Sequence, residues 1–370
     1  MKKVLKVIGI IFLILVLVII VLAIKNGINS KKTFITEDDY YKDFKSDAEL
    51  ENKYTKTGSY ETSYIEYKSD NNAIKNIKIW YPKELEISDK KYPMIMVVNA
   101  SNTEAYKYMP VFKWLSTWGF IVVGNDDGQT GNAESASETL DFMLNLDNNS
   151  ILYNKIDKDN LGIIGYSQGG AGALRAVTQF ENGKNYKAIF TGSASYPLLA
   201  KNFGWEYDVS KINIQYFMTA STGTSDDSGK DPNKEYGGVA PLSSLVDIYN
   251  NMTDNVFKVK ARATNAEHED MLLRTDGYMT AWMLYHLQND ADAGKVFIGD
   301  DTEILNNSNW QDYEIDEEGN KVLKGNKAPK KPRFKYKVKW DDVFNSKPMD
   351  KAKVILNTHA DCIEMTNIEL

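Results

Sequence analysis

The chain has 370 residues, of which 42% are hydrophobic and 12% aromatic, and its formal net charge is −7. This composition excludes intrinsic disorder and low-complexity fibres, and the single cysteine, Cys362, excludes a disulfide scaffold. The mild acidic excess gives no general electrostatic footprint for nucleic acid. We therefore expect a packed globular body without nucleic acid as a partner.

The N-terminal 25 residues are predicted to form a transmembrane signal anchor. Residues 1–6 contain three lysines, and residues 7–24 carry no charge, which is long enough to cross a bilayer. More lysines precede this run than the single Lys25 that directly follows it, so the positive-inside rule places the rest of the chain outside the cytoplasm. Cleavage as a signal peptide near Ala23 is the alternative. Residues 26–56 are polar and predict a tether between membrane and body.

Strands and helices alternate over residues 57–305, which predicts one α/β domain. The predicted strands cover residues 77–81, 93–98, 120–123, 161–164, 188–191, 214–219 and 256–259, and the predicted helices cover residues 105–118, 139–146, 171–180, 241–249 and 277–288. The run 93–98 is apolar throughout, which is typical of a strand buried on both faces. We expect a mostly parallel sheet flanked by helices.

The strongest chemical motif is the run Gly-Tyr-Ser-Gln-Gly-Gly at residues 165–170, between a predicted strand and a helix of small residues. The pattern is that of a nucleophile elbow, in which glycines permit a tight strand-to-helix turn and the serine hydroxyl stands exposed at a helix N-terminus. Ser167 is therefore the candidate nucleophile. The alternative is a glycine-rich turn whose serine only caps a helix.

The candidate base is one of only three histidines in the chain. His268 lies in a loop after the strand at 256–259, in the chain order of nucleophile, acid and histidine that this type of enzyme uses. His286 falls inside a predicted helix and is expected to be packed. His359 lies near Cys362 in the tail, and two potential ligands do not make a metal site.

The candidate acid follows the strand at 214–219. Asp226 and Asp227 both lie in the loop there; we favour Asp226 because it is nearer to the strand, with Asp227 as a solvated neighbour, although both could be turn formers. The oxyanion hole needs two backbone amides. We expect one from Gln168, directly after the nucleophile, and the other from Ser101, in the loop after the strand at 93–98.

Five segments together resemble a known family. They are Ile79-Trp80-Tyr81-Pro82, the run 114–123, the run 165–170, Phe217-Met218-Thr219-Ala220, and His268 followed by Ala281-Trp282-Met283. Residues 64–305 resemble the α/β-hydrolases related to dienelactone hydrolase, and more closely the group of cutinase-like polyester hydrolases and chlorophyllase.

This resemblance implies the α/β-hydrolase fold and a triad of Ser167, Asp226 and His268 that needs neither metal nor organic cofactor. It also implies that Tyr196 binds substrate, and Tyr166, which takes the place of the residue before the nucleophile, is counted with it as a substrate-binding residue. About 15 residues separate Tyr196 from Ile212, too few for the large cap domain of many α/β-hydrolases, so we expect an open groove for bulky or polymeric esters.

Residues 306–370 are predicted to form a β-rich appendage. Residues 300–320 contain eight acidic and no basic side chains, whereas residues 321–339 contain nine basic and no acidic ones. A hairpin turn is expected at residues 317–321 and a one-faced strand at residues 333–340. Contact of its lysines with anionic wall polymer or lipid is the alternative to a docked appendage.

These features predict a membrane-anchored extracytoplasmic serine hydrolase that cleaves carboxylic esters through an acyl-enzyme. An acyltransferase or peptidase with the same triad is one alternative, and a catalytically silent scaffold that binds the cell surface is another. The sequence does not determine the oligomeric state.

Overall fold

The computed structural model describes residues 44–254, 256–317 and 320–322. The strands are β1 (Thr62–Lys68), β2 (Asn76–Pro82), β3 (Tyr92–Val98), β4 (Ile121–Asn125), β5 (Ile156–Tyr166), β6 (Tyr186–Gly192), β7 (Gln215–Ser221), β8 (Lys258–Ala263), β9 (Trp310–Glu317) and β10 (Asn320–Val322). The α-helices are α2 (Glu49–Tyr54), α3 (Met109–Thr117), α4 (Glu134–Leu144), α5 (Gln168–Gln179), α6 (Pro197–Asn202), α7 (Leu242–Asn251), α8 (Met271–Gln288) and α9 (Ala291–Gly294).

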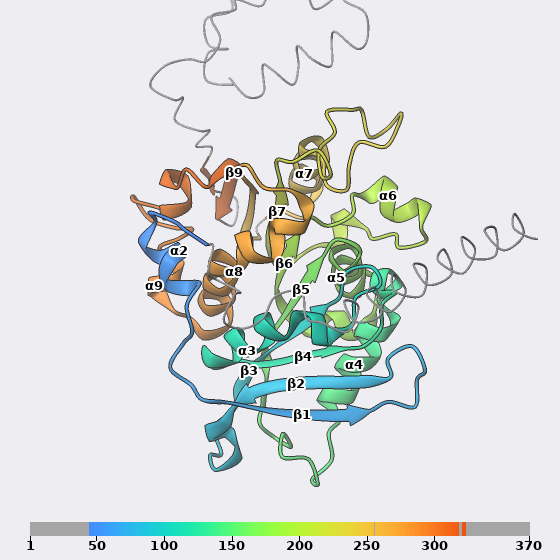
Figure 1. Cartoon of the computed structure of the whole chain (residues 1–370), viewed down its shortest axis with the longest axis vertical. Helices are drawn as coiled ribbons and strands as arrows, with labels where there is room; N and C mark the ends of the chain where they lie inside the picture. The colour runs from blue at the N-terminus through green and yellow to red at the C-terminus, as the bar shows by residue number, and fades with distance from the viewer. Residues whose placement is uncertain (1–43, 255, 318–319, 323–370) are drawn as a thin grey trace, which may run out of the picture.

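All ten strands belong to one sheet, in the order β1-β2-β4-β3-β5-β6-β7-β8-β9-β10 (Figure 1). The six adjacent strands from β4 to β8 run parallel. The pairs β1–β2, β2–β4, β8–β9 and β9–β10 are antiparallel. The predicted α/β architecture with a mostly parallel sheet is confirmed.

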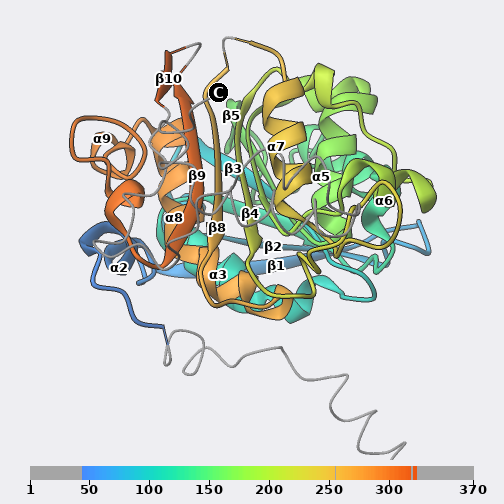
Figure 2. The ribbon, with the colours of Figure 1, turned by 90° about the horizontal axis from the view of Figure 1, so that it is seen from above.

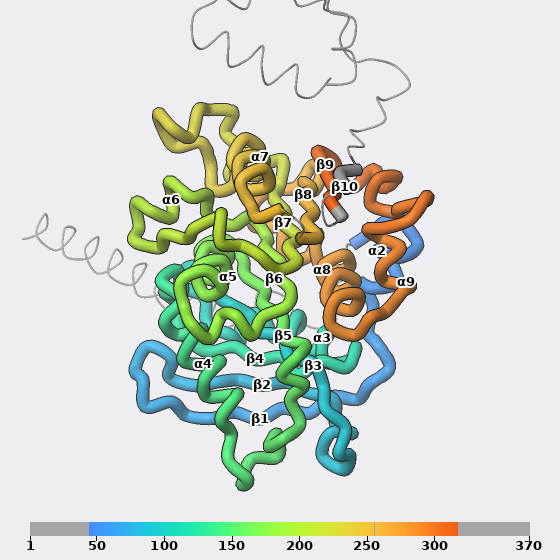
Figure 3. Tube along the Cα trace, turned by 180° about the vertical axis from the view of Figure 1, so that it is seen from behind, coloured from blue at the N-terminus to red at the C-terminus, as the bar shows by residue number. Residues whose placement is uncertain are grey.

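Helices cover both faces of the sheet, as the view from above shows (Figure 2), and the view from behind agrees with it (Figure 3). One layer holds α3 and α8, with α2 and α9 beside them, and the other holds α4, α5 and α7. Successive strand residues point to opposite faces, so Phe217 packs in the core under α8 while Met218 packs in the core on the opposite face. The apolar strands are therefore buried on both sides.

The strand β8 begins and ends later in the sequence than predicted, and it carries more charged residues. It was expected at residues 256–259, but it spans Lys258–Ala263 and contains Lys258, Lys260 and Arg262, all buried. Two of these cations pair with carboxylates of β9: Lys260 Nζ lies 3.2 Å from Glu314 Oε2, and Arg262 pairs with Asp312. A buried strand can carry charges when each has a partner, and these partners lie about 50 residues further along the chain.

The predicted tether at 26–56 is corrected at its C-terminal end, where Glu49–Tyr54 forms α2 and packs on α8. Glu51 is buried, and its carboxylate accepts hydrogen bonds from Trp310 Nε1 at 2.6 Å and Asn307 Nδ2 at 2.7 Å. The polar composition alone suggested a solvated segment. The donors that satisfy Glu51 lie more than 250 residues further along the chain, so the local sequence does not reveal its burial. The folded body therefore begins before residue 57.

The predicted domain boundary at residue 305 is also corrected. β9 pairs with β8 in the main sheet, and Trp310 and Ile315 belong to the core beneath α8 (Figure 2). The hairpin expected at residues 317–321 is present, since Asn320 of β10 pairs with Glu317 of β9. Residues 306–317 are therefore part of the body. The strand predicted at 333–340 lies outside the described residues.

No helix in the described part of the chain is long and apolar enough to cross a membrane. The anchor predicted at residues 1–25, and residues 26–43 of the predicted tether, lie outside that part.

Candidate active site

Ser167 lies in a strained turn between β5 and α5. Its φ of 55° and ψ of −121° fall in a region that side chains other than glycine rarely adopt. The turn is closed by glycines: a Cβ on Gly165 would lie 2.1 Å from Gly169 O, and one on Gly169 would lie 2.2 Å from Val98 O. This is the steric requirement that the elbow pattern predicts. Ser167 is partly exposed at the N-terminus of α5.

The other predicted triad residues follow neighbouring parallel strands, at the same edge of the sheet as Ser167. Asp226 lies in the loop after β7, and His268 begins a short 3₁₀ turn after β8. Because the carboxyl ends of parallel strands share one edge of the sheet, these loops gather there. His268 Nδ1 lies 2.6 Å from Asp226 Oδ1, so the structure brings the predicted base and acid into contact.

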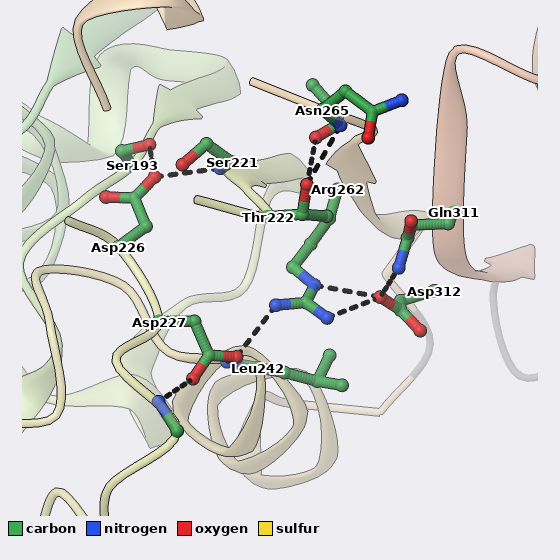
Figure 4. Close-up of polar contacts among 12 residues, drawn as sticks. Ser193, Ser221, Thr222, Asp226, Asp227, Leu242, Arg262, Asn265, Gln311 and Asp312 are labelled. Atoms are coloured by element: carbon green, nitrogen blue, oxygen red, sulfur yellow. Dashed lines mark hydrogen bonds and ion pairs between the residues drawn. The ribbon is translucent and has the colours of Figure 1, made fainter. Parts of the chain in front are cut away.

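Asp226 is completely buried, and its carboxylate has three hydrogen-bond donors. Oδ1 lies against His268 Nδ1. Oδ2 accepts from the hydroxyl of Ser193 and, at 2.8 Å, from the backbone N–H of Ser221 (Figure 4). A buried carboxylate with hydrogen-bond donors on both oxygens is fixed in orientation. It can hold the His268 ring with its proton on Nδ1, which leaves Nε2 free to accept a proton.

The pKa of His268 is raised above its ordinary value of about 6.5. Burial is the largest single influence and lowers the pKa, but the hydrogen bond to Asp226 and the negative charges of Asp226 and Glu269 raise it by more in sum. The side chain is 19% exposed, so its ring remains open to solvent on one side. This is the environment expected of a base whose imidazolium form is stabilised by a carboxylate.

Asp227 is not the solvated neighbour that the sequence suggested. Its carboxylate lies 2.8 Å from Arg262 Nη1 on β8, and both side chains are largely buried. It also accepts from the backbone N–H of Leu242, at 3.3 Å, at the start of α7. These contacts distinguish the two aspartates that the sequence left open. Asp226 Oδ1 meets His268 Nδ1, whereas Asp227 pairs with Arg262 (Figure 4).

Ser167 is tied to the segment after β6 that also contacts the acid. Its backbone N–H donates to Gly192 O at 2.9 Å, and its carbonyl accepts from Ser195 N at 3.2 Å. Between these two residues, Ser193 donates its hydroxyl to Asp226. No hydrogen bond joins Ser167 Oγ to His268 within the described residues; such contacts are often long in an enzyme without substrate.

Two backbone amides are available for an oxyanion beside Ser167. Gln168 is the first residue of α5, so its N–H has no partner within the helix. The loop after β3 lies next to the elbow because Val98 is paired with Gly165. In that loop Ala100 N donates to Tyr108 Oη and Asn102 N donates to Gly128 O. The N–H of Ser101 makes no hydrogen bond to any residue that the structure describes.

The two predicted substrate-binding tyrosines have different surroundings. Tyr166 is a core residue, 5% exposed, stacked on Tyr108 with ring centroids 6.0 Å apart. Its side chain packs in the core that lies under α8, and its contact with substrate stays a prediction. Tyr196 is also 5% exposed and donates its hydroxyl to Pro232 O, at 3.4 Å, in the loop that carries Asp226. Its contact with substrate stays a prediction.

The two other histidines are not part of this arrangement. His286 packs in α8 with its ring centroid 4.0 Å from that of Trp282, and burial, with the charge of Lys187, lowers its pKa to about 3. The expectation of a packed histidine is confirmed. His359 and Cys362 lie outside the described residues. Over residues 44–317, apart from residue 255, no group of three or more histidine, cysteine or acidic side chains is placed to hold a metal ion.

A cavity of about 370 Å³ lies elsewhere, at the amino ends of β6 and β7. Lys158, Lys187 and Gln215 line it. It opens at the opposite edge of the sheet from Ser167 and contributes nothing to the site.

Sequence reasoning missed two residues that hold the acid, Ser193 and Ser221. Both are buried at the carboxyl ends of β6 and β7, the edge at which parallel sheets place functional groups. Ser193 acts through its hydroxyl, and a polar residue just beyond a predicted buried strand was the signal that could have identified it. Ser221 acts through its backbone N–H, which no side-chain pattern reveals.

A scan against models of known protein families gives no match for this chain, and a search of curated proteins finds no relative by sequence. The family membership implied by the five segments stays a prediction.

Proposed function

We propose that this protein is a serine hydrolase that cleaves carboxylic esters through a triad of Ser167, His268 and Asp226. The observation that carries the proposal is the hydrogen bond between His268 Nδ1 and the buried carboxylate of Asp226, 2.6 Å long. Supporting it, Ser167 occupies a left-handed strand-to-helix turn, and the three residues follow the chain order of nucleophile, acid and histidine.

In this mechanism His268 Nε2 takes the proton from the Ser167 hydroxyl as its oxygen attacks the ester carbonyl carbon. Asp226 stabilises the resulting imidazolium through Nδ1–H. The imidazolium then gives its proton to the departing alkoxide, which leaves as the alcohol, and the acyl group stays on Ser167. A water molecule, deprotonated by the same histidine, attacks the acyl-enzyme and releases the carboxylic acid and free serine.

The backbone amides of Gln168 and Ser101 are proposed to bind the oxyanion of both tetrahedral intermediates. The positive end of the α5 dipole points to the same place. Amides held rigidly by a helix and a loop need no reorganisation as negative charge develops, which makes such contacts effective in lowering the barrier.

The fold is proposed to be that of the α/β-hydrolases, without a large cap. Between β6 and β7 the chain forms only the six-residue helix α6 and a short 3₁₀ turn at Val209–Lys211. The body is proposed to be anchored outside the cytoplasm by residues 1–25, because the sequence there has the length of a membrane span and its lysines precede it.

The test is hydrolysis of chromogenic acyl esters of increasing chain length by the full-length chain, alongside Ser167→Ala and His268→Ala. We expect turnover by the wild type and loss of at least about 1,000-fold in kcat for each variant. Wild-type hydrolysis that survives in both variants would contradict the triad, and release of an acyl ester or amide in place of the acid would indicate a transferase.

A further inference from the structure

Arg262 on β8 places its guanidinium between two carboxylates (Figure 4). Nη1 lies 2.8 Å from Asp227 Oδ2, while Nε and Nη2 lie 2.8 Å and 2.7 Å from Asp312 Oδ2 on β9. The three side chains are 10%, 14% and 13% exposed, in the order Arg262, Asp227, Asp312. Ion pairs at this depth are screened little by solvent, and the planar fork of arginine suits a bridge between two acceptors.

Asp227 directly follows the proposed catalytic acid in a tight turn. The backbone N–H groups of Asp226 and Asp227 both donate to Gly223 O, at 3.1 Å and 2.9 Å. The turn is also pressed against Gly238, where a Cβ would lie 2.1 Å from Asp226 O. In so tight a turn a displacement of Asp227 moves Asp226 as well.

We propose that Arg262 is a positioning residue for the proposed triad: by joining Asp227 to Asp312, it anchors the turn that carries Asp226 to the last long strand of the sheet. This inference rests on the proposed function. Ser193 and Ser221 hold the carboxylate of Asp226, whereas Arg262 holds the side chain of Asp227, the next residue of the turn. Together they set the distance between Asp226 and His268.

The neighbouring ion pair on the same two strands shows why this role exceeds strand pairing. Lys260 and Glu314 are also largely buried and 3.2 Å apart, and they join β8 to β9 without touching the loop that carries Asp226. The Lys260–Glu314 ion pair thus joins the two strands without contacting the loop of the proposed acid. Of Lys260, Glu314 and Arg262, it is Arg262 that also donates a hydrogen bond to Asp227, through Nη1.

The test compares Arg262→Gln and Arg262→Lys with Glu314→Gln in the full-length chain. The control removes one charge from the neighbouring pair at similar burial. For Arg262→Gln we expect kcat to fall about tenfold or more with KM within about twofold, because a displaced acid weakens the base and not ground-state binding. Arg262→Lys should recover only part of kcat, since one ammonium cannot reproduce the fork, and Glu314→Gln should keep the wild-type value.

A second readout separates positioning from a purely structural role. Asp226 and Glu269 are the charged groups that raise the pKa of His268, so loss of the Asp226 contact should lower it. The acid limb of kcat/KM should then move to lower pH by about half a unit in Arg262→Gln and stay in place in Glu314→Gln. Titration of the His268 imidazole by NMR, assigned with a His268→Gln variant, measures the same shift without any substrate.

The proposal is overturned if Arg262→Gln folds and its kcat and the acid limb of its kcat/KM profile equal those of Glu314→Gln. If Arg262→Gln does not fold, Asp227→Asn is measured in its place, because it leaves the pair of Arg262 with Asp312 intact; wild-type kcat and an unmoved limb would overturn the proposal equally. If the wild type hydrolyses no ester, the proposed function fails, and the NMR titration still decides whether Arg262 sets the contact between Asp226 and His268.

Discussion

Asp226 and Asp227 are identical residues at adjacent positions, but their carboxylates have different partners. Asp226 is fully buried against His268, and Asp227 is bound to Arg262. Asp226→Asn should lower kcat by about 10⁴-fold, because an amide in place of the carboxylate favours the wrong tautomer of the histidine. Asp227→Asn acts only through the position of the turn and should cost about tenfold. Steady-state kinetics of the two variants distinguish these roles, and equal losses would contradict the assignment.

The protonation state of His268 predicts the pH dependence of activity. The base must be neutral to accept the serine proton, and its pKa is raised above about 6.5 by its hydrogen bond to Asp226 in spite of burial. We therefore expect kcat/KM to rise with pH through a midpoint above 6.5. Below this midpoint the histidine is protonated, so kcat/KM should fall. A pH profile of the wild type checks this. A midpoint below 6.5 would show that burial outweighs Asp226.

At the scale of the element, the elbow depends on the absence of a side chain at Gly169. A Cβ there would meet the backbone oxygens of Val98 at 2.2 Å and Asn99 at 2.3 Å, which cannot move without shifting β3. Gly169→Ala should lower the free energy of unfolding by about 3 kcal/mol. Gly204→Ala meets nothing within 4 Å but has a φ of 77°, so it should cost only about 1 kcal/mol. Denaturant unfolding compares them, and equal losses would contradict the packing argument.

The strand β9 is the second element with a testable consequence. Trp310, Tyr313 and Ile315 are buried in the core beneath α8, and each such side chain stabilises the fold by about 1.5–3 kcal/mol. A chain that ends at residue 305 should therefore melt far below one that ends at residue 322, or fail to fold. Thermal unfolding of the two truncated chains measures the difference. Equal melting temperatures would restore the boundary that the sequence predicted.

For the whole molecule, the order of strands and helices along the parallel region followed from apolar runs bounded by turn residues. The strand at 93–98 is β3 with one residue more, because a strand buried on both faces has an unmistakable composition. The candidate site could be predicted for the same reason, because parallel strands bring Ser167, Asp226 and His268 to one edge of the sheet. Their loop positions could therefore be read from the order of strands.

What could not be predicted depends on contacts between distant residues. The burial of Glu51 needs donors from residues 307–310, and the buried cations of β8 need the carboxylates of β9. Composition alone makes such segments look solvated. Likewise, whether Tyr166 faces substrate or core depended on which face of β5 it occupies at the elbow, and the sequence pattern does not specify this.

The proposed membrane location of the whole molecule depends on its first 25 residues. Deletion of residues 2–25 should release the protein from the membrane fraction, because the only uncharged span of bilayer length is removed. Fractionation and immunoblotting of cells that express the two forms check this. Release of the full-length chain into the medium with a shortened N-terminus would favour the cleaved signal peptide.

Ser167 is proposed to be activated as a nucleophile, and phosphonylation by a fluorophosphonate tests this without knowledge of the natural ester. The reagent transfers its phosphonyl group to an activated serine oxygen and releases fluoride. By peptide mass spectrometry of the full-length chain, we expect one adduct on Ser167 that forms at least about 100-fold more slowly in His268→Ala. No adduct on Ser167, or labelling at the wild-type rate in His268→Ala, would contradict it.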